Sequence, residues 1–462
     1  MSEGTDVVVV GARCAGSAAA IALARRGRSV IALDAAHFPS DTNSTHLFFP
    51  NHWAEVAALG ALDRVMALDP PLHTRAGLGT ARSQVVGPYT DYEGFAYGSC
   101  VKRYGLDLAL VETARAAGAE VRERTKVTGL LRDATGRVSG VEWTARDGTT
   151  GTIGAKLVIG ADGRRSTVGR MVGTAEHHVF GNGRMMAYAY YRDPRTELRD
   201  LAMQWRQEDE LVTVFPCDGG QSLVLLMPPT TKAPTFRDDA IEAFEKTVAS
   251  IEPLRERLVG CERETRVRVS FEHPSYFRHS TGPGWALAGD AGHFKDPVTA
   301  QGIRDALRFG RLLGEAVAPN LEDRAGLDAA LRAWEIDRDA QCLPMYQWAN
   351  GLGLPDHISP IENAAYAWAS KSPERASEIL DVFSRKRDAD QVFTPARLLR
   401  WIGAALRDPA TSRGEVARTL KRDVGREIAR RKEAAQFQRR RAASGAEAAR
   451  STAVTDATKS AS

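Results

Sequence analysis

Glycines and one carboxylate near the start of the chain have the types and spacing that a dinucleotide site needs. The segment Gly11-Ala-Arg-Cys-Ala-Gly16 follows the apolar run Val7–Val10, and Asp34 comes 23 positions after Gly11. A glycine turn lets backbone N–H groups reach a pyrophosphate, and the helix that follows stabilises its charge. A carboxylate at the position of Asp34 can accept hydrogen bonds from ribose hydroxyls. The middle of the turn is Arg13 rather than glycine, and this motif alone does not distinguish FAD from NAD.

Two later segments combine glycine with a carboxylate directly after an apolar run. The first is Gly160-Ala-Asp162-Gly163, and the second is Gly289-Asp290, which continues through Pro297 to Gly302-Ile303 before a predicted helix. Alone, each Asp-Gly or Gly-Asp pair is typical of an ordinary turn. The three glycine and carboxylate segments in this order and at this spacing are much more specific.

The elements around the first segment read as strand, turn, helix and strand. Val7–Val10 is a β-branched run expected to be buried on both faces, Ser17–Arg26 is an alanine-rich helix ended by Gly27, and Ser29–Leu33 is a second strand. A βαβ unit of this kind predicts a parallel sheet. Further helices and strands are predicted at Leu106–Ala117, Glu120–Leu131, Gly136–Trp143, Thr150–Lys156, Leu157–Gly160, Trp285–Ala288 and Gln301–Val317.

Short strands in the middle of the chain predict a second, antiparallel sheet. They are Met185–Tyr191, Leu201–Trp205, Leu211–Phe215 and Ser222–Leu226, separated by turn residues. Tyr188 and Tyr190 are two positions apart, so both should face one side of this sheet, with Tyr191 on the other. Aromatic residues that could line an apolar substrate pocket or pack in the core are Phe48, Phe49, Tyr188, Tyr190, Trp205 and Phe215.

Together, the three segments resemble the glutathione-reductase-type FAD fold of the p-hydroxybenzoate hydroxylase superfamily, the single-component (group A) aromatic monooxygenases. Flavin-dependent halogenases and geranylgeranyl reductases are relatives of that superfamily. The stretch Phe38–His46 also resembles the loop after the second strand in a subgroup of these FAD oxidoreductases. The resemblance covers roughly residues 5 to 320 and is stronger for FAD and the fold than for the reaction.

The resemblance implies an α/β fold in several parts. A Rossmann-like FAD-binding domain is expected at residues 1–175 and 271–320, with an antiparallel β-sheet substrate domain inserted at 176–270. A helical C-terminal region is expected at 321–441. Residues 442–462 are rich in alanine, serine and threonine with few apolar anchors, which predicts a disordered tail.

The positions that the resemblance assigns to FAD binding are Gly11, Arg13, Cys14, Ala15, Gly16, Asp34, Thr45, Arg103, Val127, Asp162, Gly163, Asp290, Gly302 and Ile303. Asp162 and Gly163 would also support a transient NAD(P)H. Gly302 and Ile303 would direct backbone N–H groups at flavin N1 and its C2 carbonyl, because reduced flavin is anionic there and a helix N-terminus stabilises negative charge. Where the family often has a basic residue shortly after Asp34, this chain has two alanines.

Two residues are candidates for a catalytic role, and each also has a simpler interpretation. His46, with Thr45, lies in the loop that the resemblance puts near the flavin ring, so it could donate a proton or orient substrate; a loop histidine bonded to backbone is the alternative. Pro297 would line the ring near N5. His293 and Lys295 are expected to be solvated. The sequence has no histidine spacing typical of a metal site, so no metal is expected.

These features predict an FAD-dependent monooxygenase that uses NAD(P)H and O₂. It would hydroxylate or otherwise oxygenate an aromatic or polyketide-like molecule through a flavin C4a-hydroperoxide. One alternative is a flavin halogenase, although no Trp-x-Trp pair of the tryptophan-type enzymes is present. Another is a reductase of isoprenoid double bonds, which would need a long apolar tunnel. The third alternative is a non-catalytic flavin-binding protein. The sequence leaves open whether the chain forms a homo-oligomer.

Composition excludes several other classes of protein. In 462 residues, 43% are hydrophobic and 26% charged, which is an ordinary globular balance. The net charge of +4 arises from a basic segment at residues 421–441, which favours a solvated helix, so no nucleic-acid partner is expected. Five cysteines without a CxxC pair, and a start without a secretory signal, favour the cytoplasm. No apolar stretch is long enough to predict a membrane span.

Overall fold

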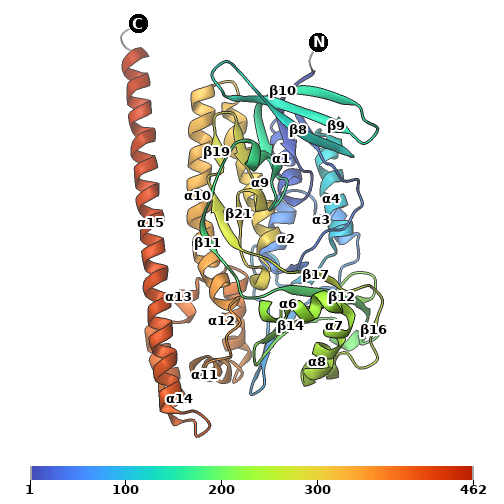
Figure 1. The fold of residues 1–462 in the computed structure, drawn as a ribbon, viewed down its shortest axis with the longest axis vertical. Coiled ribbons are helices and arrows are strands. Elements are labelled where there is room, and N and C mark those ends of the chain that lie inside the picture. Colours follow the sequence, from blue (N-terminus) through green and yellow to red (C-terminus); the bar gives the residue numbers. More distant parts are fainter. Residues whose placement is uncertain (1–2, 460–462) are drawn as a thin grey trace.

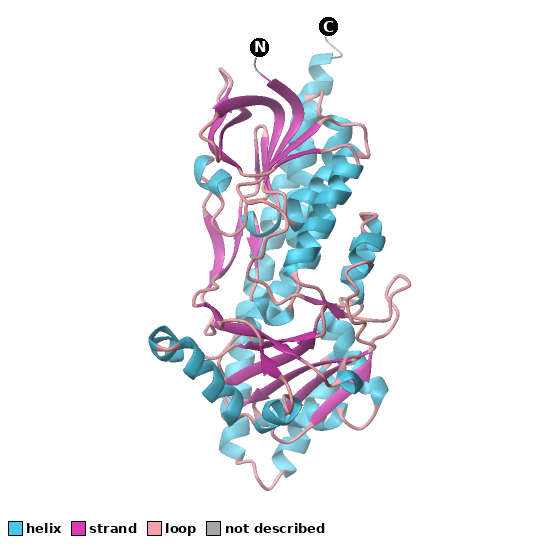
Figure 2. Cartoon of the chain, turned by 90° about the vertical axis from the view of Figure 1, so that its right-hand side faces the viewer, coloured by secondary structure: helices cyan, strands magenta, loops and turns pink. Residues whose placement is uncertain are grey.

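Two β-sheets at opposite ends of an elongated body, joined by long helices, form the architecture (Figures 1 and 2). The structure is a computed structural model that describes residues 3–459, with side chains to residue 439. The first sheet has the strand order β19-β20-β10-β1-β2-β7, with β8 and β9 attached through β10. Its strands are β1 (Glu3–Val10), β2 (Val30–Leu33), β7 (Glu120–Arg122), β8 (Thr125–Arg132), β9 (Val138–Ala145), β10 (Thr150–Gly160), β19 (Thr281–Gly282) and β20 (Trp285–Leu287).

Register in this sheet brings the predicted segments to one edge. Strands β2, β1, β10 and β20 are parallel, and Leu33, Val10, Gly160 and Leu287 are successive partners across them. The residues that follow each strand therefore emerge side by side at the carboxyl edge, where open α/β sheets bind ligands. The parallel sheet predicted from the βαβ unit is confirmed.

Helices α1 (Cys14–Ala24) and α9 (Gly302–Val317) pack closely against each other behind this edge. Their contact is made of alanines and glycines: a Cβ added to Gly314 would lie 2.8 Å from the carbonyl oxygen of Ala19. Small residues allow this approach, which explains why α1 is alanine-rich. The predicted strand Glu120–Leu131 is two strands, β7 and β8, because Arg124 between them adopts a positive φ of 55°.

The second sheet has the order β16-β12-β15-β14-β13-β4-β5, with β17 beside β12. Its strands are β4 (Arg75–Thr80), β5 (Gln84–Pro88), β12 (Met186–Arg192), β13 (Leu201–Gln207), β14 (Glu210–Pro216), β15 (Gln221–Leu226), β16 (Glu262–Arg263) and β17 (Arg268–Ser270). The second sheet therefore includes β4 and β5, which lie outside the substrate domain expected at residues 176–270. The glycines of β4, Gly77 and Gly79, lie under the side chains of Met203 and Trp205. Because glycine is neither apolar nor polar in the pattern, it hides the alternation that marks a strand.

Side chains of the second sheet divide between two cores as the spacing predicted. Tyr188 and Tyr190 pack into one core with Ile379 and Phe383, whereas Tyr191 packs into the core on the opposite face. The other helices and strands before α9 are β3 (Leu47–Phe48), α2 (Pro50–Ala58), α3 (Leu62–Met66), β6 (Ser99–Cys100), α4 (Arg103–Ala116), α5 (Thr167–Met171), β11 (Glu176–Phe180), α6 (Ala233–Asp238), α7 (Ala240–Ser250), α8 (Glu252–Arg257), β18 (Ser275–Arg278) and β21 (His293–Phe294).

The C-terminal third is helical. It comprises α10 (Arg324–Leu352), α11 (Pro360–Ala369), α12 (Pro373–Phe383), α13 (Ala389–Val392), α14 (Pro395–Arg407) and α15 (Arg413–Lys459). Helix α15 runs along the whole body beside α10 (Figure 1). It continues through residues 442–459, where the sequence predicted a disordered tail; the high helix propensity of the many alanines there accounts for the difference. Residues 460–462 lie outside the described residues. Within the described chain, no helix is both long and apolar enough to cross a membrane.

Candidate active site

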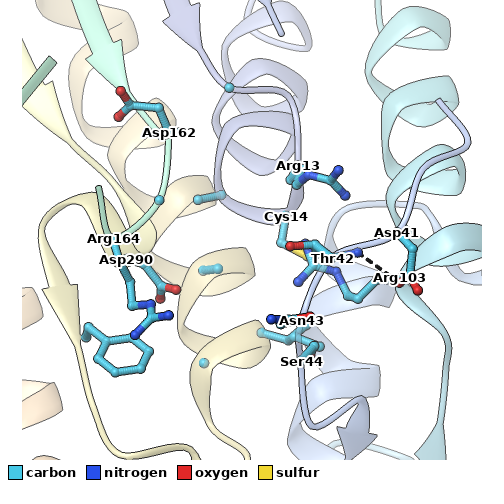
Figure 3. A pocket seen from close by; sticks show the side chains of 18 of the residues that line it. Arg13, Cys14, Asp41, Thr42, Asn43, Ser44, Arg103, Asp162, Arg164 and Asp290 are labelled. Atoms are coloured by element: carbon cyan, nitrogen blue, oxygen red, sulfur yellow. Dashed lines mark hydrogen bonds between the residues drawn. The ribbon is translucent and has the colours of Figure 1, made fainter. Parts of the chain in front are cut away.

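A cavity of about 770 Å³ opens at the carboxyl edge of the first sheet and extends to β12 and β17 of the second (Figure 3). It collects almost every residue that the sequence assigned to FAD. Those that line it are Gly11, Arg13, Cys14, Ala15, Asp34, Thr45, Arg103, Val127, Asp162, Gly163, Asp290, Gly302 and Ile303, together with Pro297. Gly16 is not in the lining. It lies under the turn, against the backbone of Gly11, where a Cβ would collide.

The glycine turn has the backbone shape that a pyrophosphate cradle requires. Gly11 adopts a φ of +96°, and a Cβ there would lie 2.5 Å from the carbonyl oxygen of Ala161. A side chain would therefore be both strained and obstructed at this position. At Gly163 and Gly302, which also line the cavity, a Cβ would meet nothing within 4 Å, so the cavity reaches the bare backbone.

Two helices begin at the cavity without a side chain to cap them. At α1 the N-cap residue is Arg13, and at α9 it is Gln301; neither makes a side-chain capping hydrogen bond. Asp239, Ser359 and Thr394 cap α7, α11 and α14, whereas α3, α4, α6 and α8 also begin without a side-chain cap. The first N–H groups of α1 and α9 are thus left to bind an anion or an electron-rich ring edge. FAD has both groups, so the donor set fits it.

Carboxylates at the ends of the strands differ in their surroundings. Asp34 accepts hydrogen bonds from the N–H groups of Ala12 and Ala36, both at 2.8 Å, which fixes it beside the turn. Asp162 accepts from Ser166 and from the first N–H groups of α5, so it also caps that helix. Burial raises the pKa of Asp290, although Arg164 and Arg103 oppose this shift.

Two arginines share one buried carboxylate beside the turn. Arg103 donates to Asp107 at 2.9 and 3.0 Å, and Arg13 also forms an ion pair with it. Both guanidinium groups line the cavity, so the pair holds one net positive charge where a pyrophosphate would lie. Burial raises the pKa of the Cys14 thiol to about 12, so Cys14 stays neutral and offers its backbone.

At the far end, the cavity becomes polar between the loop before β3 and the second sheet. The Tyr188 hydroxyl donates to Oδ1 of Asn43 at 3.3 Å, and Arg268 forms an ion pair with Asp41 at 2.8 Å. All four residues line the cavity. Burial raises the pKa of Tyr188, while Arg268 nearby partly offsets this. The arrangement offers a neutral hydroxyl donor next to a cation, which suits an oxygen-bearing ring.

His46 lies behind this wall and is not among the cavity-lining residues of the described chain. It is fully buried with a positive φ of 61°, and its Nε2 is 3.2 Å from the Tyr190 hydroxyl. Burial and the charge of Arg103 lower the pKa of His46 to about 3, so its imidazole is neutral. Its place fits a residue that orients Tyr190 better than one that touches the flavin.

Several functional groups here carry no sequence signal that could have identified them. Arg268 lines the cavity and belongs to no recognisable motif, whereas Asn43 and Arg164 line it from segments whose pattern did not single them out. Lys295, expected to be solvated, is buried and forms an ion pair with Asp305. Register across two sheets brings these residues together, and single-sequence patterns do not encode it.

Asp305 lies at the centre of a buried cluster of positive charge. In addition to Lys295, it pairs with Arg304 at 3.0 Å and with Arg385 at 2.9 Å. Burial alone would raise the pKa of Asp305, but the three cations hold it well below its usual range. Because Lys295 lines the cavity, the cluster presents excess positive charge to whatever binds near the start of α9.

Comparison with known proteins agrees with this site. A family model described as FAD binding domain matches residues 4–343. Menaquinone reductase of Mycolicibacterium smegmatis is 32% identical over 328 residues, covering 68% of this chain and 76% of that protein. Digeranylgeranylglycerophospholipid reductase of Methanocella arvoryzae is 28% identical over 339 residues, which cover 69% of this chain and 78% of that protein.

Solved structures show the same fold at lower identity. The myxobacterial chondrochloren halogenase CndH matches with a TM-score of 0.68 and 19% identity, over 90% of this chain and 99% of that one. PqsL of Pseudomonas aeruginosa, described as a probable FAD-dependent monooxygenase, matches with a TM-score of 0.61 and 18% identity. The match covers 82% of this chain and 100% of that one.

Proposed function

The chain belongs to the FAD binding domain family and is an FAD-dependent oxidoreductase, and from this premise we propose that it is an NAD(P)H-dependent monooxygenase. Its substrate is a small aromatic or polyketide-like ring that carries a phenolic or carbonyl oxygen. One oxygen atom of O₂ enters the ring and the other leaves as water, while NAD(P)H supplies two electrons. FAD, when bound, carries these electrons to O₂.

The polar end of the cavity is the observation that carries this proposal. Tyr188 and Arg268 lie where a ring between the two sheets would present its oxygen. A neutral hydroxyl next to a guanidinium group binds a phenol, and it favours the phenolate as electron density moves into the ring.

Residues of the chain perform three tasks in this reaction. The glycine turn, Arg13 and Arg103 bind the pyrophosphate and keep the cofactor in place. The N-terminus of α9 and the cluster around Lys295 stabilise negative charge at the pyrimidine edge of the ring. Tyr188 and Arg268 orient the substrate, and the Tyr188 hydroxyl exchanges a proton with its oxygen, while the packed second sheet excludes water.

A reductase is the second candidate, and the curated relatives favour it. Menaquinone reductase and digeranylgeranylglycerophospholipid reductase match two thirds of the chain at 28–32% identity. In a reductase, Tyr188 would donate the proton that accompanies a hydride to a quinone or an activated double bond. The two candidates share the cofactor and the pocket, and they differ in whether O₂ is consumed.

One experiment separates these reactions. The FAD-loaded protein is mixed without oxygen with NADH or NADPH and a panel of phenols, quinones and prenylated quinones, and flavin absorbance is followed. For a monooxygenase, one class of compound accelerates flavin bleaching, no product forms until O₂ is admitted, and the product then contains label from ¹⁸O₂. Product formation without oxygen would reject this proposal and support the reductase. Without bleaching by either nucleotide, while a chemical reductant still works, both NAD(P)H-dependent reactions are excluded.

A further inference from the structure

Helix α14 exposes an apolar stripe at one end of the molecule, outside the residues that match the family model (Figure 1). Its inner face packs on α11 through Trp401 and Ala405. On the outer face, Leu399 is 70% exposed and Leu406, seven positions later, is 45% exposed. Seven positions make two turns, so both leucines point the same way, with Gly403 between them.

Unpaired arginines flank the apolar stripe. Arg400 and Arg407 each follow one of the leucines, so they form a parallel row about 100° around the helix. Neither has an ion-pair partner among the described residues, whereas the neighbouring Arg397 pairs with Glu378. Leu398, 38% exposed, widens the apolar face on the other side. The result is an amphipathic face with leucines in the middle and arginine at its border.

Charge in the surrounding segment has the same sign. Residues 395–432, which include α14 and the first part of α15, contain eleven basic and four acidic side chains, although the whole chain is only +4. Val424 and Ile428, one turn apart on α15, are exposed by 56% and 50%. A basic segment that also exposes aliphatic side chains is typical of a peripheral membrane contact.

We propose that the outer face of α14 docks this protein on the surface of an anionic lipid bilayer. Leu399 and Leu406 enter the boundary between headgroups and acyl chains, while Arg400 and Arg407 stay at the level of the lipid phosphates. A second copy of the chain fits this surface poorly, because a two-fold contact would bring the same arginine rows together. The docking does not depend on the reaction proposed above.

The test uses the full-length FAD-loaded protein and sedimentation with vesicles. The vesicles are either phosphatidylcholine alone or an equimolar mixture of phosphatidylcholine and phosphatidylglycerol. We expect binding to the mixed vesicles, weak binding to phosphatidylcholine, and release by molar salt, because salt screens the arginine–phosphate attraction. The double variant L399E/L406E should reduce binding to mixed vesicles by about tenfold or more.

A matched control has the same change at exposed aliphatic residues elsewhere. Ile241 is 47% exposed and Val259 is 63% exposed, and both lie in the α7–α8 region. The variant I241E/V259E should bind the mixed vesicles like the wild type, and R400E/R407E should bind less at low salt. Equal loss in the leucine and control variants, or no wild-type binding to mixed vesicles, would overturn the proposal. A wild-type dimer in solution that L399E/L406E dissociates would assign the surface to a second copy instead.

Discussion

The Tyr190 hydroxyl and Nε2 of His46 lie 3.2 Å apart in a fully buried contact directly behind the wall of the cavity. Because the imidazole is neutral, it serves as a fixed hydrogen-bond partner and not as a cation. Tyr190 stacks edge-to-face with Tyr188 at a ring distance of 6.1 Å. His46 also contacts the ring of Tyr188 edge-to-face at 6.0 Å, so it supports both tyrosines from behind the cavity wall.

The first prediction concerns the Tyr188 hydroxyl. Tyr188→Phe should lower kcat by about 100-fold, because a positioned proton donor or acceptor is lost while the ring still packs. FAD content and flavin reduction by NAD(P)H without substrate should stay unchanged. Tyr191→Phe is the control, since Tyr191 lies on the opposite face of the sheet and contacts Glu245. Equal turnover by the two variants would remove Tyr188 from the reaction.

A second prediction tests the pyrophosphate cradle. Gly11→Ala should yield protein with about tenfold less FAD, read from the ratio of flavin to protein absorbance, because the new Cβ obstructs the turn. The matched control is Gly27→Ala, because Gly27 also has a positive φ of 72° but an added Cβ there would meet nothing within 4 Å. The Gly27→Ala variant should lose about 1 kcal/mol of folding stability and keep its FAD. Normal FAD content in Gly11→Ala would contradict this role.

The third prediction addresses the buried cluster around Asp305. Asp305→Asn should lower the free energy of unfolding by about 3–5 kcal/mol, because it leaves three buried cations without their carboxylate. Lys295→Met should cost clearly less, since two cations still neutralise Asp305. Urea unfolding of both variants at neutral pH gives the comparison. A larger loss for Lys295→Met would show that the Lys295–Asp305 ion pair, and not the two arginines, holds the cluster together.

Acid should destabilise the protein below about pH 6.5. Burial lowers the pKa values of His46 and His52 to about 3 and that of His73 to about 4. The unfolded chain binds protons near pH 6.5 and the folded chain does not, so each histidine costs about 2 kcal/mol at pH 5. Asp296 and Asp339 work in the opposite direction, because burial raises their pKa values to about 6.

Burial also lowers the pKa of His273 to about 4 and holds that of His293 well below its usual range, so the net expectation is a loss of about 5–7 kcal/mol between pH 8 and pH 5. Urea unfolding at several pH values measures it directly. A flat or rising profile across this interval would mean that the acidic side chains outweigh the histidines.

Sequence patterns predicted the first sheet, whose glycine segments come to the edge where the cavity opens, because each segment follows a buried strand. Gly11, Asp162 and Asp290 are local signals of this kind. Arg268 is not such a signal, because it reaches the cavity only through the pairing of β17 with β12. Asn43 and Lys295 lie in segments that the sequence singled out, but nothing local shows that their side chains reach the cavity. Strands β4 and β5 escaped prediction for a similar reason, since the glycines of β4 lie against large side chains of β13 and the glycine of β5 lies against α12.

Helix α12 lies so close to β5 that a Cβ on Gly87 would come within 2.7 Å of the Cβ of Ala376. Together with Ile379 and Phe383, this contact seals the sheet face that carries Tyr188. The packed core beneath the cavity wall therefore extends beyond the part of the chain that matches its family. A chimaera that exchanges the second sheet between relatives must transplant residues 360–383 with it, and trimming the chain at residue 343 would leave a bare, aggregation-prone surface.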